Sequence, residues 1–431
     1  MKPLFALLTT LWLALSLNAN AASQPLPPLT ALQAQQGIII DTRPSAFYNG
    51  WPAQGRSGHE PGALNLAASW LPLMDDDQLR QWADTHHITP QQTLALYGSP
   101  TEINAVTQRL TQLGFPHVTT LSDALTQPAR LQRLAHYEQL VYPQWIADLQ
   151  QGKAVANAPH GKWKLFEAAW GAPKQYLLSH IPGAGYIDTN TVESEPLWNK
   201  VSDAQLKALL AKQGIRHDTT VILYGRDVYA AARVAQILLY AGVQDVRLLD
   251  GGFQTWQQAD LPVERGLPAD QKPAADFGAP LPGAPQLMLS TAQARQLLGR
   301  DDASLVSIRS WPEFIGTTSG YSYIKPKGEI AGARWGHAGS DATHMEDFHN
   351  PDGTMRSADD IAAMWRTWHI TPNQQVAFYC GTGWRASEAF MYARAMGWPH
   401  IGVYDGGWYE WSANPANPEV RGARGPQSSW H

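Results

Sequence analysis

The chain repeats one order of strands, turns and helices three times, and this repetition constrains its fold more than any other feature. Each copy contains a short apolar run that ends in tyrosine; these runs are residues 94–97, 221–224 and 376–379. A turn precedes each run, at residues 59–63, 180–184 and 329–333. Short apolar strands separated by helical segments predict an α/β fold in which each copy has a mainly parallel sheet flanked by helices.

The ends of the copies repeat less evenly. Asp250-Gly-Gly-Phe253 and Asp405-Gly-Gly-Trp408 close the second and third copies, whereas the first copy has no such segment. A strand that ends in polar residues opens the first copy at 37–43 and the third at 305–309. Residues 153–158 are the interpreted counterpart in the second copy.

These limits predict three tandem domains. The first unit spans residues 26–133, the second 137–264 and the third 287–431. A proline-rich linker, 265–286, joins the second unit to the third, and its composition indicates some stiffness. The polar tail beyond Pro415 is expected to lie on the surface or to be disordered.

The single cysteine of the chain, Cys380, directly follows the predicted strand 376–379. Gly381 and Gly383 permit a tight loop with backbone N–H groups turned inward, and a helical pattern begins at Ala386. A helix N-terminus and the nearby charge of Arg385 favour a thiolate. Cys380 is therefore the predicted nucleophile; the alternative is an inert buried thiol.

The other loop residues are given supporting roles. The backbone N–H groups of Gly381 through Arg385 are expected to surround the sulfur, and Arg385 is interpreted as the clamp of the loop. Thr382 and Trp384 are expected to face the mouth, where they would meet the donor or acceptor. Glycine occupies the place of Cys380 in the other copies, at Gly98 and Gly225, so the first two units are predicted to be catalytically inactive.

Together these motifs resemble the rhodanese (sulfurtransferase) family. The resemblance rests on the Asp41-Thr-Arg43 strand end, the His180-Ile-Pro-Gly-Ala184 turn, the Cys380-Gly-Thr-Gly-Trp-Arg385 loop and the closing Asp405-Gly-Gly-Trp408. It covers almost the whole mature chain. It implies a thiosulfate sulfurtransferase-like enzyme that holds a sulfane sulfur as a Cys380 persulfide and passes it to cyanide or a thiol. Neither a cofactor nor a metal is expected.

The third unit departs from the family at the place where the donor anion is bound. Two-domain thiosulfate sulfurtransferases often carry an arginine four residues after the strand-end arginine, which is Arg309 here, but this chain has Glu313. We expect that carboxylate to repel thiosulfate. Lys325, Lys327 and Arg334 are the candidate replacements for donor binding, with solvated surface cations as the alternative.

Three other functions deserve comparison. A non-enzymatic persulfide carrier, fed by a sulfur-relay protein, fits the two cysteine-free units and the missing donor arginine. A cysteine phosphatase is disfavoured because only four residues separate Cys380 from Arg385, one fewer than in the phosphatase-like branch of the fold. A metal site among His337, His344 and His349 is disfavoured because their spacing matches no common site.

Composition and the N-terminal residues limit the expected partners and the expected location of the protein. The net charge is −5 and no basic run occurs, so neither nucleic acid nor an anionic membrane is an expected partner. Lys2, the apolar stretch 4–17 and Ala19-Asn20-Ala21 predict a cleaved signal peptide over residues 1–22 and a periplasmic protein; an uncleaved anchor is the alternative. A single cysteine excludes an internal disulfide.

Overall fold

The computed structural model describes residues 37–426, so the predicted signal peptide and the start of the first unit lie outside the described residues. The first unit has a parallel sheet in the order β2-β1-β3-β4. Its main elements are β1 (Ile38–Asp41), β2 (Leu64–Asn65), β3 (Leu94–Tyr97), β4 (Val118–Thr120), α2 (Ser45–Asn49), α3 (Asp76–Thr85) and α4 (Pro100–Gln112).

The second unit has a five-stranded parallel sheet in the order β5-β11-β10-β6-β7. Its strands are β5 (Leu140–Val141), β6 (Trp163–Ala169), β7 (Gly185–Asp188), β10 (Thr220–Tyr224) and β11 (Asp245–Leu249). Its helices are α5 (Pro143–Gln150), α6 (Lys174–Leu178), α7 (Asp203–Lys212), α8 (Val228–Ala241) and α9 (Gly252–Gln258). A small antiparallel pair, β8 (Glu193–Ser194) and β9 (Asn199–Lys200), projects from this unit.

One strand of the second unit was placed wrongly from the sequence. Residues 153–158, interpreted as the opening strand, form turns and irregular chain, and the strand between β10 and β7 is β6. The physical reason is composition: β6 carries Lys164 and Glu167 among its apolar residues, so it lacks the continuous apolar run that marks the other central strands.

The third unit has a parallel sheet in the order β12-β17-β16-β13-β15. Its strands are β12 (Met288–Leu289), β13 (Ala303–Ser307), β15 (Arg334–Trp335), β16 (Gln375–Tyr379) and β17 (Ile401–Tyr404). Its helices are α10 (Thr291–Leu297), α11 (Trp311–Phe314), α12 (Ala358–Arg366), α13 (Trp384–Ala395) and α14 (Gly407–Ala413). The three sheets confirm the predicted α/β class.

The tail is ordered further than the sequence indicated. β18 (Glu419–Val420) pairs antiparallel with β14 (Glu329–Ile330), and the guanidinium of Arg424 donates to the carbonyl of Phe314. Of the two alternatives for the tail beyond Pro415, residues up to 426 follow the first: they lie mostly on the surface and are ordered, not disordered. Backbone hydrogen bonds to the third unit hold this segment.

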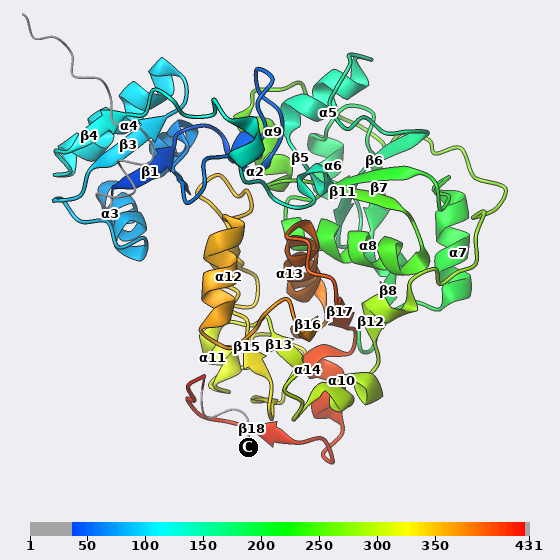
Figure 1. The fold of residues 1–431 in the computed structure, drawn as a ribbon. Helices are drawn as coiled ribbons and strands as arrows, with labels where there is room; N and C mark the ends of the chain where they lie inside the picture. Colours follow the sequence, from blue (N-terminus) through cyan, green and yellow to red (C-terminus); the bar gives the residue numbers. More distant parts are fainter. Residues whose placement is uncertain (1–36, 427–431) are drawn as a thin grey trace, which may run out of the picture.

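The second and third units share one hydrophobic core. α8 and α13 pack side by side where the two units meet (Figure 1). Nearly every residue of both helices is buried, which explains why neither has a polar face. The core runs continuously from Val234 and Leu238 of α8 to Phe390 and Ala393 of α13.

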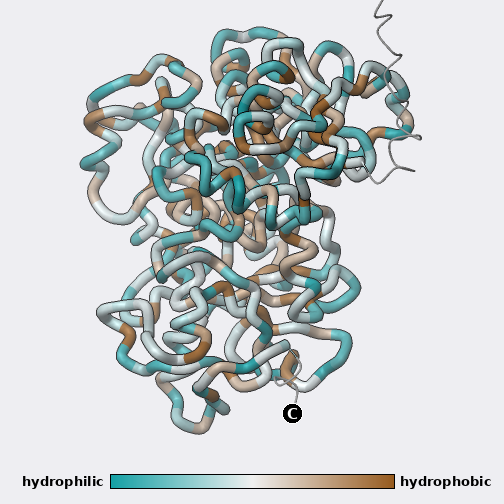
Figure 2. Tube along the Cα trace, turned by 90° about the vertical axis from the view of Figure 1, so that its left-hand side faces the viewer, coloured by the Kyte–Doolittle hydropathy of each residue, from teal (hydrophilic) through white to brown (hydrophobic). Residues whose placement is uncertain are grey.

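The first unit has its own core and attaches through both apolar and polar contacts. Trp51 is buried in an apolar cluster of the second unit, where its ring lies 5.6 Å from that of Trp145. Trp70 donates its indole N–H to Asp352 of the third unit at 2.8 Å, and the hydroxyls of Ser45 and Thr354 lie 3.0 Å apart. Figure 1 shows the sheet of this unit with α3 and α4 on the left, whereas its α2 lies beside the second unit. In Figure 2 the apolar stretches are short and alternate with polar ones, and no helix within residues 37–426 has the length and apolar character that a bilayer crossing requires.

Candidate active site at Cys380

Cys380 lies in a tight loop between β16 and α13. Its side chain is buried, and the backbone N–H of Gly383 donates to its sulfur at 3.1 Å. Gly383 is the N-cap of α13 with a φ of 111°, a left-handed conformation that favours glycine. The sulfur therefore lies at the positive end of the helix, beside an amide that already points to it.

The closing Asp405–Trp408 segment holds the other side of this loop. The backbone N–H of Trp408 donates to the carbonyl of Cys380 at 2.8 Å, and that of Tyr409 donates to the carbonyl of Gly381 at 3.1 Å. Gly407, with a φ of 56°, lies so close that a Cβ there would stand 2.6 Å from the Gly381 oxygen and 2.7 Å from the Cys380 oxygen. The repeated Asp-Gly-Gly motif thus fixes the orientation of the loop peptides.

We expect Gly407→Ala to lower turnover at Cys380 by about a hundredfold, because the new methyl group displaces the two loop carbonyls. Steady-state sulfur transfer and thiol titration of the folded protein measure the effect. Gly422→Ala is the matched control: Gly422 also has a positive φ, 98°, but its Cβ would meet nothing within 4 Å. Unchanged turnover in Gly407→Ala would show that this segment does not position the loop.

Arg385 is held by a carboxylate rather than by solvent. Its Nη1 and Nη2 donate to both oxygens of Glu313 at 2.9 Å each, and Nη2 also donates to the hydroxyl of Tyr321 at 2.9 Å. Both charged groups are almost fully buried. Arg385 therefore fixes the start of α13 as a brace, with its charge already neutralised.

Glu313 does not act as the sequence suggested. It faces inward to Arg385 and Arg309, and its Oε2 also accepts from the hydroxyl and N–H of Ser310 as part of the cap of α11. Burial opposes ionisation, but attraction to Arg385 and Arg309 lowers the pKa of Glu313 to about 2. The expectation that this carboxylate repels a donor anion is wrong, because its charge is paired inside the protein.

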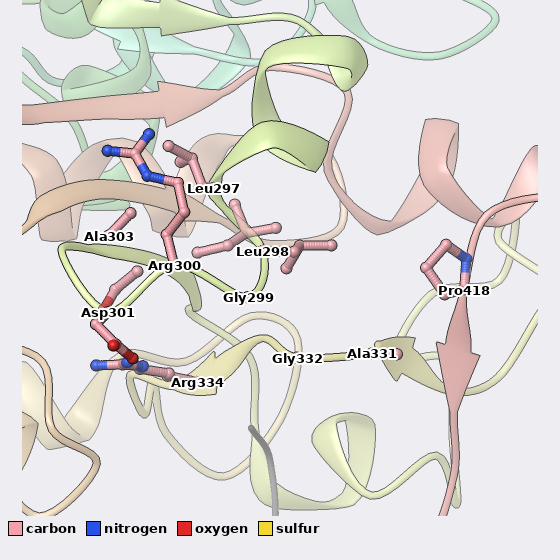
Figure 3. A pocket seen from close by; sticks show the side chains of 12 residues that line it. Leu297, Leu298, Gly299, Arg300, Asp301, Ala303, Ala331, Gly332, Arg334 and Pro418 are labelled. Atoms are coloured by element: carbon pink, nitrogen blue, oxygen red, sulfur yellow. The ribbon is translucent and has the colours of Figure 1, made fainter. Parts of the chain in front are cut away.

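The three cations predicted for donor binding do not gather at Cys380. Lys325 and Lys327 are exposed, and neither lines the cavity at the loop. Arg334 lines a different cavity of about 350 Å³, next to Arg300 and Asp301, near the start of β13 (Figure 3). β13 and β16 run parallel, so that cavity lies at the edge of the sheet opposite to the Cys380 loop. Position on short β15 determines where Arg334 points, and sequence spacing does not reveal it.

A cavity of about 420 Å³ opens at the Cys380 loop. The third unit lines it with loop residues Thr382, Trp384 and Arg385 and with Tyr321 and Tyr323 from the preceding segment. The second unit contributes Trp170, Glu193, Trp198 and Tyr229. Thr382 and Trp384 thus line the mouth where the sequence had placed them. The other aromatic residues were missed, because they come from irregular segments or from a different unit.

The second unit is bound to the active loop through a buried ion cluster. Arg233 of α8 is fully buried and donates to Glu193 at 3.0 Å and to Asp405 at 2.6 Å. Glu193 in turn accepts the indole N–H of Trp384 at 2.5 Å. Trp384 of the Cys380 loop and Asp405 of the closing segment are therefore both connected to the second unit.

A second buried cluster lies on the other side of the α8–α13 contact. Asp250, the counterpart of Asp405 in the second unit, accepts the N–H of Met355 at 2.8 Å. His349 contacts Glu388 of α13 at 2.5 Å. Burial raises the pKa of Asp250 to about 7, and the nearby charges of Asp352 and Glu388 add to the rise while His349 opposes it.

A carboxyl whose pKa is raised by folding stabilises the protein below its unfolded pKa and loses that contribution as the pH rises through about 7. We therefore expect the free energy of unfolding to fall by more than about 1 kcal/mol between about pH 5 and pH 8. Denaturant titrations at several pH values measure this slope. Asp250→Asn keeps an acceptor for the N–H of Met355 and should reduce the pH dependence of the free energy of unfolding. The remaining dependence includes Glu193, because burial raises the pKa of Glu193 to about 7 as well.

The exposed substitution Asp260→Asn serves as the control and should leave the slope unchanged. A slope that is as steep in Asp250→Asn as in the parent protein would contradict the assignment.

The glycines that replace cysteine in the other units have no room for a thiol. A Cβ at Gly98 would lie 2.2 Å from the hydroxyl of Thr42, and one at Gly225 would lie 2.4 Å from the carbonyl of Asp227. Of the histidines considered as metal ligands, His344 pairs with Asp341 and His337 lies near Asp347. Across residues 37–426 no cluster of three or more metal-binding side chains occurs.

The family model described as a rhodanese-like domain matches residues 28–127, 151–259 and 290–414. The chain belongs to the rhodanese-like family. All three sheets, including the two without cysteine, therefore come from rhodanese-like domains, as the motifs predicted.

Several rhodanese-like relatives match most of the chain. Thiosulfate sulfurtransferase YnjE of Escherichia coli strain K12 is 69% identical over 421 residues, which are 97% of this chain and 97% of that protein. The crystal structure of YnjE has a TM-score of 0.92 at 71% identity and covers 93% of this chain and 97% of that chain. This chain is thus similar to YnjE in both sequence and domain arrangement.

Two further rhodanese-like proteins are informative. The anaerobic ergothioneine biosynthesis enzyme of Chlorobium limicola, solved with its natural substrate trimethyl histidine, has a TM-score of 0.87 at 36% identity and covers 92% of this chain and 99% of that chain. Sulfur carrier protein TtuD of Thermus thermophilus is 29% identical over 263 residues, which are 57% of this chain and 87% of that protein.

Proposed function

We infer that this protein is a sulfurtransferase that carries sulfane sulfur as a persulfide on Cys380. The observation that carries this inference is the sulfur of the single cysteine, buried at the start of α13 with the N–H of Gly383 3.1 Å away. The similarity to thiosulfate sulfurtransferase YnjE over nearly the full chain supports it. Thiosulfate or a similar sulfane compound is the proposed donor.

The reaction has two displacement steps. The Cys380 thiolate attacks the outer sulfur of the donor; the sulfur–sulfur bond of thiosulfate breaks and sulfite leaves with the electron pair. An acceptor thiolate or cyanide then attacks the outer sulfur of the persulfide, which releases persulfidated thiol or thiocyanate and regenerates the Cys380 thiolate. The N–H of Gly383 and the start of α13 stabilise the sulfur anion in both states.

A thiosulfate–cyanide assay, combined with intact mass analysis, tests the function. Turnover that accompanies a gain of one sulfur atom on Cys380 supports the enzyme. The alternative function is a non-enzymatic carrier that a partner protein loads, in line with the similarity to sulfur carrier protein TtuD. Persulfide formation with negligible turnover on small donors would favour that alternative. The absence of both would overturn the sulfurtransferase inference.

The acceptor is a small thiophilic molecule or the thiol of a sulfur-relay protein. The relative from Chlorobium limicola, solved with trimethyl histidine, adds a nitrogen heterocycle to the acceptor classes for testing. A periplasmic address is part of the proposal, because residues 1–22 have the pattern of a cleaved signal peptide. Cell fractionation with N-terminal sequencing of the mature chain tests it: a cytoplasmic, uncleaved protein would contradict the export.

A further inference from the structure

We propose that the cavity at the Cys380 loop binds an organic cation, so that positively charged thiols are preferred acceptors of the Cys380 sulfur. The proposal deepens the proposed function and rests on it. It concerns the chemical class of the acceptor. The evidence is the combination of aromatic walls and an excess of negative charge around the cavity.

Aromatic side chains from two units form the walls. Trp170, Trp198 and Tyr229 come from the second unit, and Tyr321, Tyr323 and Trp384 from the third. The rings of Tyr229 and Trp384 lie 5.8 Å apart, so one pair of walls joins the two units. Trp170 remains 65% exposed and Tyr323 44% exposed, although both line the cavity. The ring of Tyr321 already has the guanidinium of Arg385 5.7 Å from its centroid, which shows a cation held at one of these walls. The remaining aromatic side chains are of the kind that attracts alkylammonium groups.

The charges around the cavity favour the same sign of ligand. Among its described lining residues only Glu193 and Arg385 carry charge. Arg385 is neutralised by the bidentate contact with Glu313. Glu193 shares one guanidinium, that of Arg233, with the carboxylate of Asp405.

The ammonium group of Lys200, a residue that contacts this cluster, does not neutralise the second carboxylate. Lys200 donates its backbone N–H to Asp405, but its ammonium pairs with Asp203 at 2.8 Å. Because burial raises the pKa of Glu193 to about 7, two carboxylates share one buried cation beside the aromatic walls at pH values above that. A cation that enters the cavity therefore meets aromatic side chains and a net negative charge.

The size of the cavity also exceeds the needs of cyanide. It holds about 420 Å³, and Trp170 and Trp384 also line a neighbouring cavity of about 430 Å³ at the loop of Arg226 in the second unit. An acceptor that carries a trimethylammonium or ammonium group beside its thiol fits this volume.

The chemical step needs no additional oxidant or reductant. The acceptor thiolate attacks the outer sulfur of the persulfide, a new sulfur–sulfur bond forms and the bond to the Cys380 sulfur breaks with its electron pair. The products are the acceptor persulfide and the Cys380 thiolate. The cation of the acceptor stays in the cavity during this exchange and changes only the affinity and the orientation of the attack.

The test uses the full chain, loaded with thiosulfate and freed of excess donor by gel filtration. Thiocholine, 2-mercaptoethanol and 3-mercaptopropionate then discharge the persulfide in rapid-quench measurements. Each rate is expressed per thiolate and divided by the rate of the same thiol with a small free persulfide. We expect thiocholine to exceed 3-mercaptopropionate by roughly tenfold or more.

Two substitutions test whether the ratio of the thiocholine rate to the 3-mercaptopropionate rate depends on the cavity. Glu193→Gln removes a charge, and Trp198→Leu removes an aromatic face; each should narrow the ratio at least about threefold. Trp198→Phe keeps a ring and should retain most of the preference, which guards against a folding defect in Trp198→Leu. Trp82→Leu, a half-buried tryptophan of the first unit, is the matched control and should leave the ratio unchanged.

The outcomes separate this proposal from the proposed function. Equal normalised rates for the three thiols, or a preference for 3-mercaptopropionate, overturn the cation site while leaving the sulfurtransferase intact. A protein that gains no sulfur on Cys380 fails at the earlier step and overturns the proposed function itself.

Discussion

Cys380→Ser abolishes persulfide formation and lowers sulfur transfer by at least about a thousandfold, because the hydroxyl does not ionise at neutral pH and cannot hold a sulfane sulfur. The loop itself should survive, since serine is smaller and can still accept the Gly383 N–H that now reaches the sulfur at 3.1 Å. Thiosulfate–cyanide turnover and intact mass after donor treatment are the two measurements.

The chain offers an unusually clean background for this experiment. Cys380 is its single cysteine, so any sulfur that the parent protein gains by persulfidation is located without further mapping. Thr317→Ala, in an exposed segment of the third unit, is a suitable control for handling and folding. Turnover within tenfold of the parent value in Cys380→Ser would rule out the persulfide route.

Arg385→Met should destabilise the protein by about 3–5 kcal/mol, because it leaves the buried carboxylate of Glu313 with one cationic partner, Arg309, in place of two. Urea denaturation measures the change. Turnover should also fall by more than about a hundredfold, since the braced start of α13 carries the Cys380 loop. The exposed Arg366→Met in α12 is the control and should change stability by less than about 0.5 kcal/mol.

The double variant Arg385→Met/Glu313→Gln provides the sharper test of this pair. Removal of the uncompensated charge should restore much of the stability that the single substitution loses, so the two effects are not additive. Turnover should stay low, because the brace is still missing. Purely additive losses of stability would show that Arg385 and Glu313 are not coupled as the geometry indicates.

The Cys380 loop could be predicted from the sequence because the residues that indicate it are close together in the chain. Cys380, the glycines beside it and Arg385 lie within six consecutive positions, and the repeats placed them after a strand. The role of Glu313 was misread because a residue number says nothing about the direction of a side chain. In the structure Glu313 caps α11 and holds Arg385, more than seventy positions away in the sequence.

The cavity could not be predicted for a related reason. Glu193 lies on β8 of a cysteine-free unit and Trp198 in the turn between β8 and β9, and they reach the third unit only because α8 packs on α13. The hydrophobic pattern of a single segment does not indicate contacts between residues so far apart in the sequence. Tyr321 and Tyr323 gave a weak signal, two aromatic residues in a polar glycine-serine segment, but nothing in the sequence tied them to Cys380.

The shared core of α8 and α13 bears on how such a protein can evolve. A duplicated copy that has lost its chemistry is usually free to drift or to be deleted. Here the apolar helix α8 of the cysteine-free second unit forms part of the core that also contains α13 of the third unit, so both units are constrained by the same packing. We therefore expect a split between these two units to expose the facing apolar surfaces of α8 and α13, and an exchange of repeats to preserve the fold when both units are exchanged together.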